Sequence, residues 1–370
     1  MAKTIGVIGG GQLARMMIAP ALELGLQIKV LAETEDSPAA LAAIMVGDYK
    51  DLATVLEFAK EVDVVTFDHE HVPIKVLEEL ESQGFIVEPS SKALQYAQNK
   101  LLMRKRLAEL GVPIPDWAEV TSAEELDSFI SGHSGVAILK TPTGGYDGKG
   151  VRVVRSADDA KDWLAQGVPL LVEEKVEFVR ELAQLSARNR SGDWISWPVV
   201  QTVQVDGVCN EVQSPAPHAD YVKAAEIART IAQGLDVTGV LAVELFEKED
   251  GTLLVNELAM RPHNSGHFTI EGTTTSQFEQ HLRAVSDLPL GSVSATANFA
   301  VMLNLLGQND SNNFVDLLPD TLNSESGSHV HIYGKSARTG RKMGHVTALS
   351  NESLESARTQ AQASWNGLQA

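Results

Sequence analysis

Short apolar runs alternate with amphipathic segments along the first hundred residues of the chain. Runs of this length are typical of buried strands, and the segments between them have the spacing of helices with one apolar face. Such alternation predicts a parallel sheet with helices covering it. The expected strands are Thr4–Ile8, Gln27–Leu31, Val62–Phe67 and Phe85–Glu88, and the expected helices are Gln12–Leu24, Leu52–Glu61 and Pro73–Ser82.

The pattern changes after these residues. One helix is expected over Ser91–Leu110, and the Gly-Val-Pro-Ile-Pro sequence that follows is typical of a boundary. Residues 115–290 mix strands, hairpin turns and helices, which is an α+β pattern. Residues 292–306 restart with small residues and a strand, and residues 352–368 have the pattern of an amphipathic terminal helix. A chain of 370 residues with these changes is expected to contain two or three domains.

A hairpin pattern places two carboxylates near each other. A turn signal at Lys248–Gly251 separates the apolar run Gly239–Phe246 from a second strand. With a two- or four-residue loop, Glu244 lies opposite Val255, and Glu257 is its diagonal neighbour on the same face, at roughly 7–8 Å between backbone positions. Two such carboxylates suit a divalent hard cation that also binds nucleotide phosphates. A three-residue loop would reverse the parity and remove this argument.

A polar stretch continues from the second carboxylate. The sequence NELAMRPHNSGH, Asn256–His267, adds a guanidinium, two imidazoles and an amide to Glu257 within a few residues. One alternative is that the two glutamates are a surface side chain and a capping side chain, because most charged residues are simply solvated. The concentration of polar groups favours a binding site over this alternative.

Composition narrows the function classes. Apolar content of 44% and charged content of 21% are those of a soluble globular protein, no apolar run reaches the length of a membrane span, and the N-terminus has no signal-peptide pattern. A single cysteine, Cys209, cannot form an internal disulfide, which fits a reducing cytosol. The net charge of −19 argues against nucleic acid and anionic membranes as partners, but not against small phosphorylated ligands held by local loops.

The first strand is followed by a glycine turn. In VIGGGQLA, Gly9, Gly11 and Ala14 fit the G-x-G-x-x-G/A spacing of a dinucleotide-binding turn, and Glu33 stands about where a ribose-binding acid would lie. Taken alone, the motif suggests a nicotinamide-dependent dehydrogenase. The alternative is a tight turn that any doubly wound domain can use.

A second glycine motif, KTPTGGYDGKGV, covers Lys140–Val151. It is not a Walker A loop, because threonine stands where that motif has its first glycine, and glycine stands where it has serine or threonine. A loop with four glycines between two strand-like runs can fold over phosphates, and Lys140 at the end of the first run can reach them. The alternative is a flexible surface hairpin, which would not need Tyr146 and Asp147 at its tip.

A third motif is basic. Lys335, Arg338, Arg341 and Lys342 lie close together in YGKSARTGRKMGHV, within an otherwise acidic chain. A basic turn with glycines suits a substrate phosphate. A solvated basic loop is the alternative.

The strand that ends at Phe67 continues into DHEHV, at the carboxyl edge of the expected sheet, where ligands usually bind. His69 and His71 alternate with two acidic residues, but a His-x-His pair without a third ligand is a weak metal signal. Polar side chains that line a cleft are the favoured interpretation.

Together these motifs resemble the ATP-grasp superfamily, and most closely the family of 5-(carboxyamino)imidazole ribonucleotide synthases of purine synthesis. The resemblance covers nearly the whole chain, and it rests on the order and spacing of GGGQLARM, KTPTGGYDGKG, NELAMRPHNSGH with TSQFEQHLRA, and GRKMGH. It implies an α/β and α+β protein with an N-terminal Rossmann-like domain (1–97), an ATP-grasp domain (98–290) with a lid at about 115–178, and a small C-terminal domain (291–370). It also implies a cytoplasmic homodimer.

The resemblance implies a set of ATP-binding residues. Two lysines would hold the phosphates under the glycine loop, the VEEKV segment would lie beside adenine, and an acid after it would accept from the ribose hydroxyls. The set is Lys100, Lys140, Gly145, Tyr146, Asp147, Gly148, Lys149, Gly150, Glu173, Glu174, Lys175, Val176, Glu181, Asn256 and Glu257.

The resemblance also implies the metal, substrate and catalytic residues. Glu244 and Glu257 would bind Mg²⁺, with Mn²⁺ as a substitute. The residues facing bicarbonate and aminoimidazole ribonucleotide would be Tyr146, Asp147, Arg261, His263 and Asn264, and those on its 5′-phosphate would be Lys335, Arg341 and Lys342. The catalytic residues would be Lys140, Asp147, Arg261 and His263.

The chain departs from the family pattern at a few positions. Ala14 replaces a frequent glycine, Lys100 stands where arginine is common, and Met260 replaces a frequent proline. Gln201 stands where a histidine is usual and is left out of the expected site. In FDHEHV only Glu70 matches the family.

The implied reaction is the ATP- and bicarbonate-dependent carboxylation of 5-aminoimidazole ribonucleotide to N5-carboxyaminoimidazole ribonucleotide, through carboxyphosphate. Whether Asp147 or His263 handles the amine proton is left open, as is a free CO₂ intermediate. One alternative is another ATP-grasp ligase or transformylase of purine synthesis. A dehydrogenase built on the glycine turn is a second, and it would leave Glu244, Glu257 and Lys140 without a role. A non-catalytic ATP sensor is a third.

Overall fold

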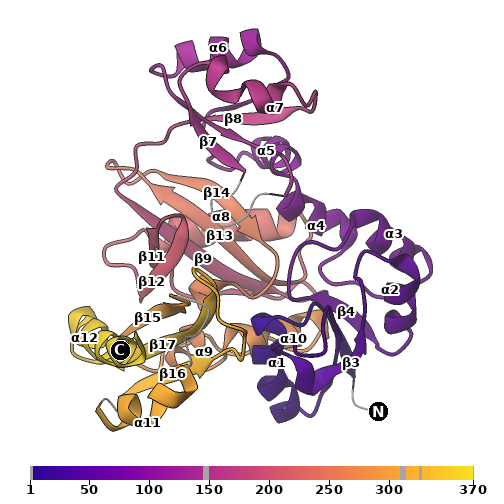
Figure 1. The fold of residues 1–370 in the computed structure, drawn as a ribbon, viewed down its shortest axis with the longest axis vertical. Coiled ribbons are helices and arrows are strands. Elements are labelled where there is room, and N and C mark those ends of the chain that lie inside the picture. The colour runs from indigo at the N-terminus through magenta and orange to yellow at the C-terminus, as the bar shows by residue number, and fades with distance from the viewer. Residues whose placement is uncertain (1–2, 145–149, 309–313, 325–326, 370) are drawn as a thin grey trace.

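The computed structural model describes residues 3–144, 150–308, 314–324 and 327–369. Its strands form two four-stranded sheets and one nine-stranded sheet. In Figure 1 the N-terminal sheet lies to the right in indigo, a small lobe stands at the top, and the large sheet lies below that lobe. Within the described residues, no helix is both long and apolar enough to cross a membrane.

The N-terminal sheet is parallel, with the order β3-β2-β1-β4. Helix α1 packs on one of its faces and α2 and α3 on the other, so its strands are apolar on both sides. The parallel sheet with covering helices is therefore confirmed, and β3 is an additional strand. The elements are β1 (Thr4–Ile8), α1 (Gln12–Glu23), β2 (Gln27–Ala32), β3 (Ala43–Val46), α2 (Leu52–Ala59), β4 (Val64–Phe67) and α3 (Ile74–Ser82).

The predicted strand Phe85–Glu88 is wrong. Only an isolated bridge between Val65 and Val87 joins this segment to the sheet. Two backbone hydrogen bonds form this bridge, from the Val65 amide to the Ile86 carbonyl at 2.9 Å and from the Glu88 amide to the Val65 carbonyl at 2.8 Å, and Val87 lies in the buried core.

The predicted single helix Ser91–Leu110 is also wrong, because it is divided into α4 (Ser91–Gln98) and α5 (Lys100–Glu109). Asn99 between them has extended backbone angles, and its side chain accepts hydrogen bonds from the amides that begin α5. Asparagine favours such a cap because its side chain competes for backbone amides. The break makes Lys100 the first residue of a new helix.

The lobe at the top of Figure 1 is an antiparallel sheet with the order β5-β8-β6-β7, covered by α6 and α7. It has its own apolar core, which includes Leu139 and Val172. The ends of the glycine motif meet in this sheet, where Lys140 pairs with Val151. The elements are β5 (Trp117–Val120), α6 (Ala123–Gly132), β6 (Ala137–Lys140), β7 (Val151–Val154), α7 (Lys161–Leu164) and β8 (Leu170–Glu174).

The large sheet is antiparallel, with the order β14-β13-β9-β11-β12-β15-β17-β16, and β10 pairs with β9. The first strands of this sheet and the helices between them are β9 (Arg180–Arg188), β10 (Trp194–Ser196), β11 (Val200–Val205), β12 (Val208–Ser214), α8 (Tyr221–Gly234), β13 (Gly239–Glu247), β14 (Leu253–Ala259), α9 (Thr269–Gly272) and α10 (Gln277–Val285). The remaining strands and helices are β15 (Phe299–Leu306), α11 (Phe314–Ser324), β16 (Ser328–Ile332), β17 (Lys342–Ser350) and α12 (Leu354–Gln369).

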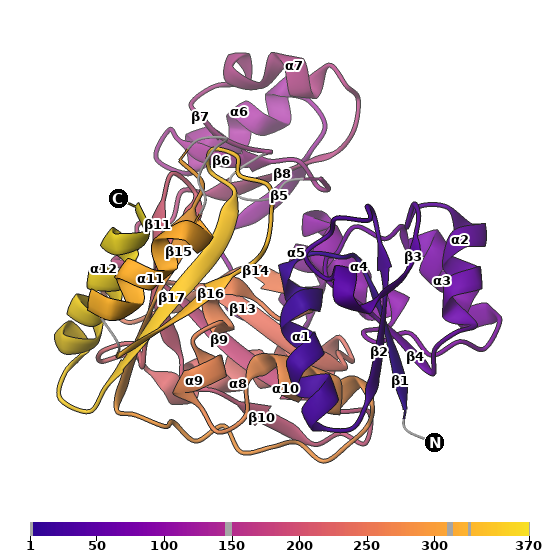
Figure 2. The same cartoon turned by 60° about the horizontal axis from the view of Figure 1, so that its bottom comes forward.

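The residues after 290 continue the large sheet, because β15 pairs with β12. They also have a core of their own, where α12 packs on β15 and β17, as Figure 2 shows at the yellow end of the chain. The predicted terminal helix at 352–368 is confirmed by α12. The domain boundaries at 97/98 and 290/291 stay predictions.

One buried histidine ties the N-terminal sheet to the large sheet. His281 on α10 is fully buried, and its Nδ1 accepts a hydrogen bond of 3.1 Å from the amide of Val240 on β13. The ring proton is therefore on Nε2, which donates to the hydroxyl of Thr66 on β4 at 2.8 Å. Burial lowers the pKa of His281 to about 3, so the ring is neutral at physiological pH.

Replacing His281 by glutamine should reduce the acid sensitivity of the fold. In the unfolded chain this histidine takes up a proton near pH 6.5. Its pKa of about 3 in the folded protein means that stability is lost as the pH falls below about 6.5. This one group contributes a slope of about 1.4 kcal/mol per pH unit. The free energy of unfolding, measured in urea between about pH 7 and about pH 5, should fall less steeply in His281→Gln than in the wild type.

The matched control for this experiment is His329→Gln, because His329 is exposed on β16. It is expected to keep the wild-type slope. An equal slope in wild type and His281→Gln would show that the buried ring does not act as assigned.

Candidate active site

The hairpin β13–β14 holds both predicted metal-binding carboxylates, but its register differs from the prediction. The amide of Lys248 donates to the carbonyl of Thr252 at 2.9 Å, which leaves a three-residue turn. As a result Leu245 pairs with Val255, in the place predicted for Glu244. The predicted register is wrong, because a turn with an odd number of residues shifts the pairing by one residue.

A β-bulge brings the two carboxylates back to one face. The pairing shifts by one residue between Val243 and Leu245, so Glu244 faces both Asn256 and Glu257. The extra residue on β14 restores the alternation that the turn had reversed. Burial and the neighbouring Glu257 carboxylate raise the pKa of Glu244 to about 7.

A third carboxylate lies on the same face of the sheet. On β9, Glu181 pairs with Phe246 while Ala183 pairs with Glu244, so the two glutamates are diagonal neighbours. Burial raises the pKa of Glu181, and its charge further raises that of Glu244. This concentration of negative charge favours the binding of a cation.

Lys100 partly compensates that charge from the start of α5. Its Nζ lies 2.7 Å from Glu257 Oε1. Burial disfavours the charged form of Glu257, but Lys100 and Lys140 outweigh burial and lower its pKa. The family departure at Lys100 therefore keeps a cation at this position.

The carboxylates of Glu244 and Glu257 fit a hard divalent cation. Their side chains are 31% and 36% exposed, so a ligand can reach them. Magnesium commonly uses one or two carboxylates together with substrate phosphates. In the part of the chain that the structure describes, no group of three or more His, Cys, Asp or Glu side chains forms a metal cage.

Lys140 projects from the end of β6 towards the large sheet. Its Nζ lies 2.7 Å from Glu173 Oε2 and donates to Asn256 Oδ1 at 3.2 Å. Arg104 pairs with the other oxygen of Glu173. Burial disfavours the charged carboxylate, but Arg104 and Lys140 outweigh burial and lower the pKa of Glu173 to about 2. The structure thus brings Lys100, Lys140, Glu173, Asn256 and Glu257 together.

A cavity of about 410 Å³ borders this group of charged residues. It is lined by Asn99 and Leu101, which flank Lys100, and by Thr141, which follows Lys140. The carbonyl of Gly150 accepts the Thr141 amide at 3.0 Å. The predicted loop residues Gly145, Tyr146, Asp147, Gly148 and Lys149 lie outside the described residues.

The segment 175–179 links β8 in the upper lobe to β9 in the large sheet. Glu174 accepts a hydrogen bond of 3.1 Å from the Asp116 amide, and Lys175 pairs with Glu177 at 2.6 Å. These side chains already have partners within the protein. The backbone amides and carbonyls of the link, which includes Val176, are therefore the groups suited to hydrogen bonding with adenine. Next to it, Phe178 stacks on Phe246 with ring centroids 4.6 Å apart.

Glu70, from the segment after β4, holds Arg261. Its Oε2 lies 3.3 Å from Arg261 Nε, and its Oε1 accepts the Met260 amide at 2.5 Å. The Nε2 atom of the neighbouring His69 lies 3.2 Å from Glu33 Oε1, and the His69 ring stacks on that of His71 with centroids 5.2 Å apart. The interpretation of FDHEHV as polar side chains that line a cleft stays a prediction.

His263 lies beside Glu244, one of the two predicted metal-binding carboxylates. Its Nε2 is 3.4 Å from Glu244 Oε1, and its Nδ1 lies 2.8 Å from the Ser265 hydroxyl. Burial, and after it the charges of Arg261 and Lys342, lower the pKa of His263 to about 3. The ring is therefore neutral near pH 7, as a proton acceptor must be.

Asn264, predicted to face the substrate, is buried, and its amide group is engaged by Asn304 on β15. The two side chains exchange hydrogen bonds of 2.9 and 2.6 Å. Asn304 had no signal in the sequence, because it lies within an apolar strand.

The basic motif approaches the site from the C-terminal part of the sheet. Lys335 donates to Gln12 Oε1 at 2.5 Å, so it meets the glycine turn of the N-terminal sheet. The charge of Lys342 offsets a small part of the rise in the pKa of Glu244, and after burial and Arg261 it adds to the lowering of the pKa of His263. Arg341 instead donates to the Ser336 carbonyl at 2.9 Å within its own loop.

The glycine turn itself is filled by side chains of this chain. Asp68 Oδ1 accepts the amide of Ala14 at 2.7 Å, and Glu33 accepts the amide of Gly10 at 2.9 Å. A Cβ at Gly11 would lie 2.1 Å from the Asp68 carboxylate, so only glycine allows this approach. The first turn of α1 binds a carboxylate of the protein where a dinucleotide would place its pyrophosphate, which argues against the dehydrogenase alternative.

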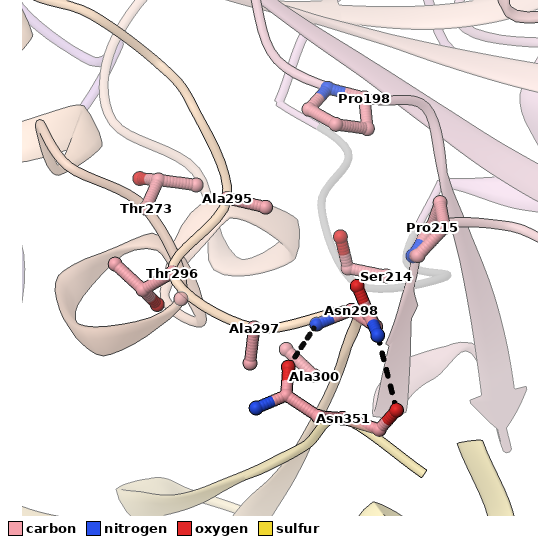
Figure 3. A pocket seen from close by; sticks show the side chains of 11 residues that line it. Pro198, Ser214, Pro215, Thr273, Ala295, Thr296, Ala297, Asn298, Ala300 and Asn351 are labelled. Atoms are coloured by element: carbon pink, nitrogen blue, oxygen red, sulfur yellow. Dashed lines mark hydrogen bonds between the residues drawn. The ribbon is translucent and has the colours of Figure 1, made fainter. Parts of the chain in front are cut away.

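A second cavity, of about 280 Å³, lies apart from these residues (Figure 3). It is lined by Ser214, Thr273 and the pair Asn298 and Asn351, whose two hydrogen bonds measure 3.1 and 3.0 Å. None of its lining residues is among the predicted site residues.

Family models match the chain in three consecutive parts. Residues 1–98 match the ribonucleotide synthetase preATP-grasp domain, residues 105–278 the ATP-grasp domain, and residues 300–360 the phosphoribosylaminoimidazole carboxylase C-terminal domain. These matches confirm the predicted fold class.

Two relatives that match over most of their length are both named N5-carboxyaminoimidazole ribonucleotide synthase. The N5-carboxyaminoimidazole ribonucleotide synthase of Mycobacterium tuberculosis (strain H37Rv) is 48% identical over 363 residues, which cover 95% of this chain and 85% of the relative. The enzyme of the same name from Corynebacterium ammoniagenes is 45% identical, covering 96% and 90%.

A solved structure of the Aspergillus clavatus N5-carboxyaminoimidazole synthase, in complex with ADP and 5-aminoimidazole ribonucleotide, superposes with a TM-score of 0.89. It is 33% identical and covers 100% of this chain and 99% of its own. The chain belongs to the N5-carboxyaminoimidazole ribonucleotide synthase family of ATP-grasp ligases.

Proposed function

We propose that this chain uses ATP and bicarbonate to carboxylate the exocyclic amine of 5-aminoimidazole ribonucleotide, a step of purine synthesis. The observation that carries the proposal is the meeting of Lys100, Lys140, Glu244 and Glu257 at the β14 bulge. ATP and the ribonucleotide are the small-molecule partners. A homodimer and a cytoplasmic location stay predictions of the family resemblance.

Lys100 and Lys140 would bind the ATP phosphates, because Lys100 pairs with Glu257 and Lys140 donates to the neighbouring Asn256. Glu244 and Glu257 would hold Mg²⁺, or Mn²⁺, which neutralises charge on the phosphate oxygens when bound. The backbone of 175–179 would face adenine, and Glu181 on the adjoining strand would accept from the ribose hydroxyls.

The first step joins bicarbonate to the γ-phosphoryl group. A bicarbonate oxygen attacks the γ-phosphorus, the bond to the β-phosphate oxygen breaks, and carboxyphosphate and ADP result. Lys140 would stabilise charge on the transferred group. Arg261, which Glu70 holds in place, would grip carboxyphosphate through two parallel donors, a geometry that lysine cannot copy.

The second step transfers the carboxyl group to the amine and releases phosphate. The amine must lose a proton, and the neutral ring of His263 is one acceptor, with Asp147 of the loop as the other. Lys335 and Lys342 would hold the 5′-phosphate of the ribonucleotide, with Arg341 on the same loop.

We expect ADP release from Mg-ATP in bicarbonate buffer to rise strongly when aminoimidazole ribonucleotide is added. The reason is that carboxyphosphate turns over productively only when an acceptor amine is present. The coupled assay should be accompanied by detection of an acid-labile carboxylated product. ATP binding without stimulation by the ribonucleotide would retain the ATP-grasp assignment and point to a different acceptor.

Replacing Glu257 by glutamine should lower turnover by about a hundredfold or more, because one of the two metal-binding carboxylates is lost. The fold should survive, since this side chain is 36% exposed. The measurement is ADP release over a Mg²⁺ titration, with circular dichroism to verify folding. Glu249→Gln, in the exposed turn of the same hairpin, is the matched control. Normal Mg²⁺-dependent turnover in Glu257→Gln would rule out the metal assignment.

A further inference from the structure

Arg104 lies between the two halves of the site and has no part in the steps above. Its side chain is 0% exposed, which is unusual for arginine. It lies one helical turn after Lys100 on α5, so the two side chains share a face. Its Nη1 donates to the Val255 carbonyl at 3.0 Å, its Nη2 to the Asn256 carbonyl at 2.8 Å, and its Nε pairs with Glu173.

Together with the contacts of Lys140, these contacts form a closed ring of hydrogen bonds and ion pairs across the site. The second oxygen of Glu173 lies 2.7 Å from Lys140, and Lys140 donates to the Asn256 side chain at 3.2 Å. The backbone carbonyl of Asn256 in turn accepts from Arg104. The ring joins α5, β6, β8 and β14, and within it the carboxylate of Glu173 is shared by two cations.

Lys140 has two tasks that compete. In this structure it neutralises Glu173, whose side chain is 3% exposed, and in the proposed function it binds the ATP phosphates. A buried carboxylate without a cation is costly, so Lys140 can turn away only if another cation remains on Glu173. Arg104 is suited to remain, because two backbone carbonyls anchor its guanidinium and because arginine stays charged.

We propose that Arg104 is a positioning residue that keeps Glu173 neutralised, so that Lys140 can be released to ATP. By holding the carbonyls of Val255 and Asn256, it also fixes the bulge that presents Glu257. The inference rests on the assignment of Lys140 to ATP in the proposed function. Arg104 acts through Lys140 and through the bulge, without touching substrate.

The test is the dissociation constant for ATP, measured by calorimetry in the absence of the ribonucleotide. In Arg104→Met, Lys140 is the only cation left on Glu173, and the dissociation constant is expected to rise about tenfold or more. In turnover, the loss should fall on KM for ATP more than on kcat.

The decisive comparison is the double variant Arg104→Met with Glu173→Gln. Glutamine removes the charge that retains Lys140, so the double variant should bind ATP more tightly than Arg104→Met alone. If Arg104 contributed only to stability, the double variant would not regain ATP affinity, because it loses a second buried group. A double variant that binds ATP no better than the single variant would overturn the proposal.

Two other variants keep the test decisive if Arg104→Met does not fold. Glu173→Gln alone should bind ATP at least as tightly as the wild type, and weaker binding would count against the proposal. Arg104→Lys keeps a charge but cannot reach both carbonyls and Glu173, so its affinity should lie between those of wild type and Arg104→Met. An affinity of Arg104→Lys for ATP equal to that of the wild type would also count against the proposal.

Arg190→Met is the matched control. Arg190 makes a two-fold hydrogen-bonded pair with Glu88, at 3.0 and 2.8 Å, away from the site. Its loss should lower the thermal midpoint without changing ATP affinity. The proposed function is tested separately, because stimulation of ADP release by the ribonucleotide in the wild type does not depend on the outcome for Arg104.

Discussion

The carboxylate of Glu173, buried between Arg104 and Lys140, joins the upper lobe to α5, and Arg104 in turn holds β14 of the large sheet. Removing one partner of such a buried pair typically costs about 3–5 kcal/mol, so the geometry of the three groups is strongly constrained. Lys140 ends the strand that leads into the glycine loop, and Arg104 grips the strand that carries Glu257. The position of Lys140 relative to the strand that carries Glu257 therefore depends on this group of contacts.

The chemistry of the site follows from an imbalance of charge. Glu181, Glu244 and Glu257 lie on one face, and the raised pKa of Glu244, about 7, results from burial and from the nearby carboxylates. Lys100 relieves only part of this repulsion, through Glu257. A phosphate-bound divalent cation would relieve the rest, which is why an acidic chain can bind an anionic nucleotide.

The outer parts of the chain complete the site by supporting its residues. Glu70 at the edge of the parallel sheet holds Arg261, and Gln12 of the glycine turn meets Lys335 from the C-terminal part of the large sheet. In the glycine turn, Asp68 occupies the start of α1. A motif that in isolation suggests a dinucleotide thus serves here to join the N-terminal sheet to the C-terminal part of the large sheet.

The sequence by itself determined the parallel N-terminal sheet and the hairpin that carries Glu244 and Glu257, because apolar periodicity and turn residues act locally. Only the tertiary structure decided the hairpin register, the helix break and the ring through Arg104. A turn of three residues reversed the parity, and a bulge opposite Glu244 restored it. Asn99 caps a new helix where periodicity continued without interruption. Arg104 shares a helix face with Lys100, but its partners are distant in sequence, and such contacts exist only once the chain has folded.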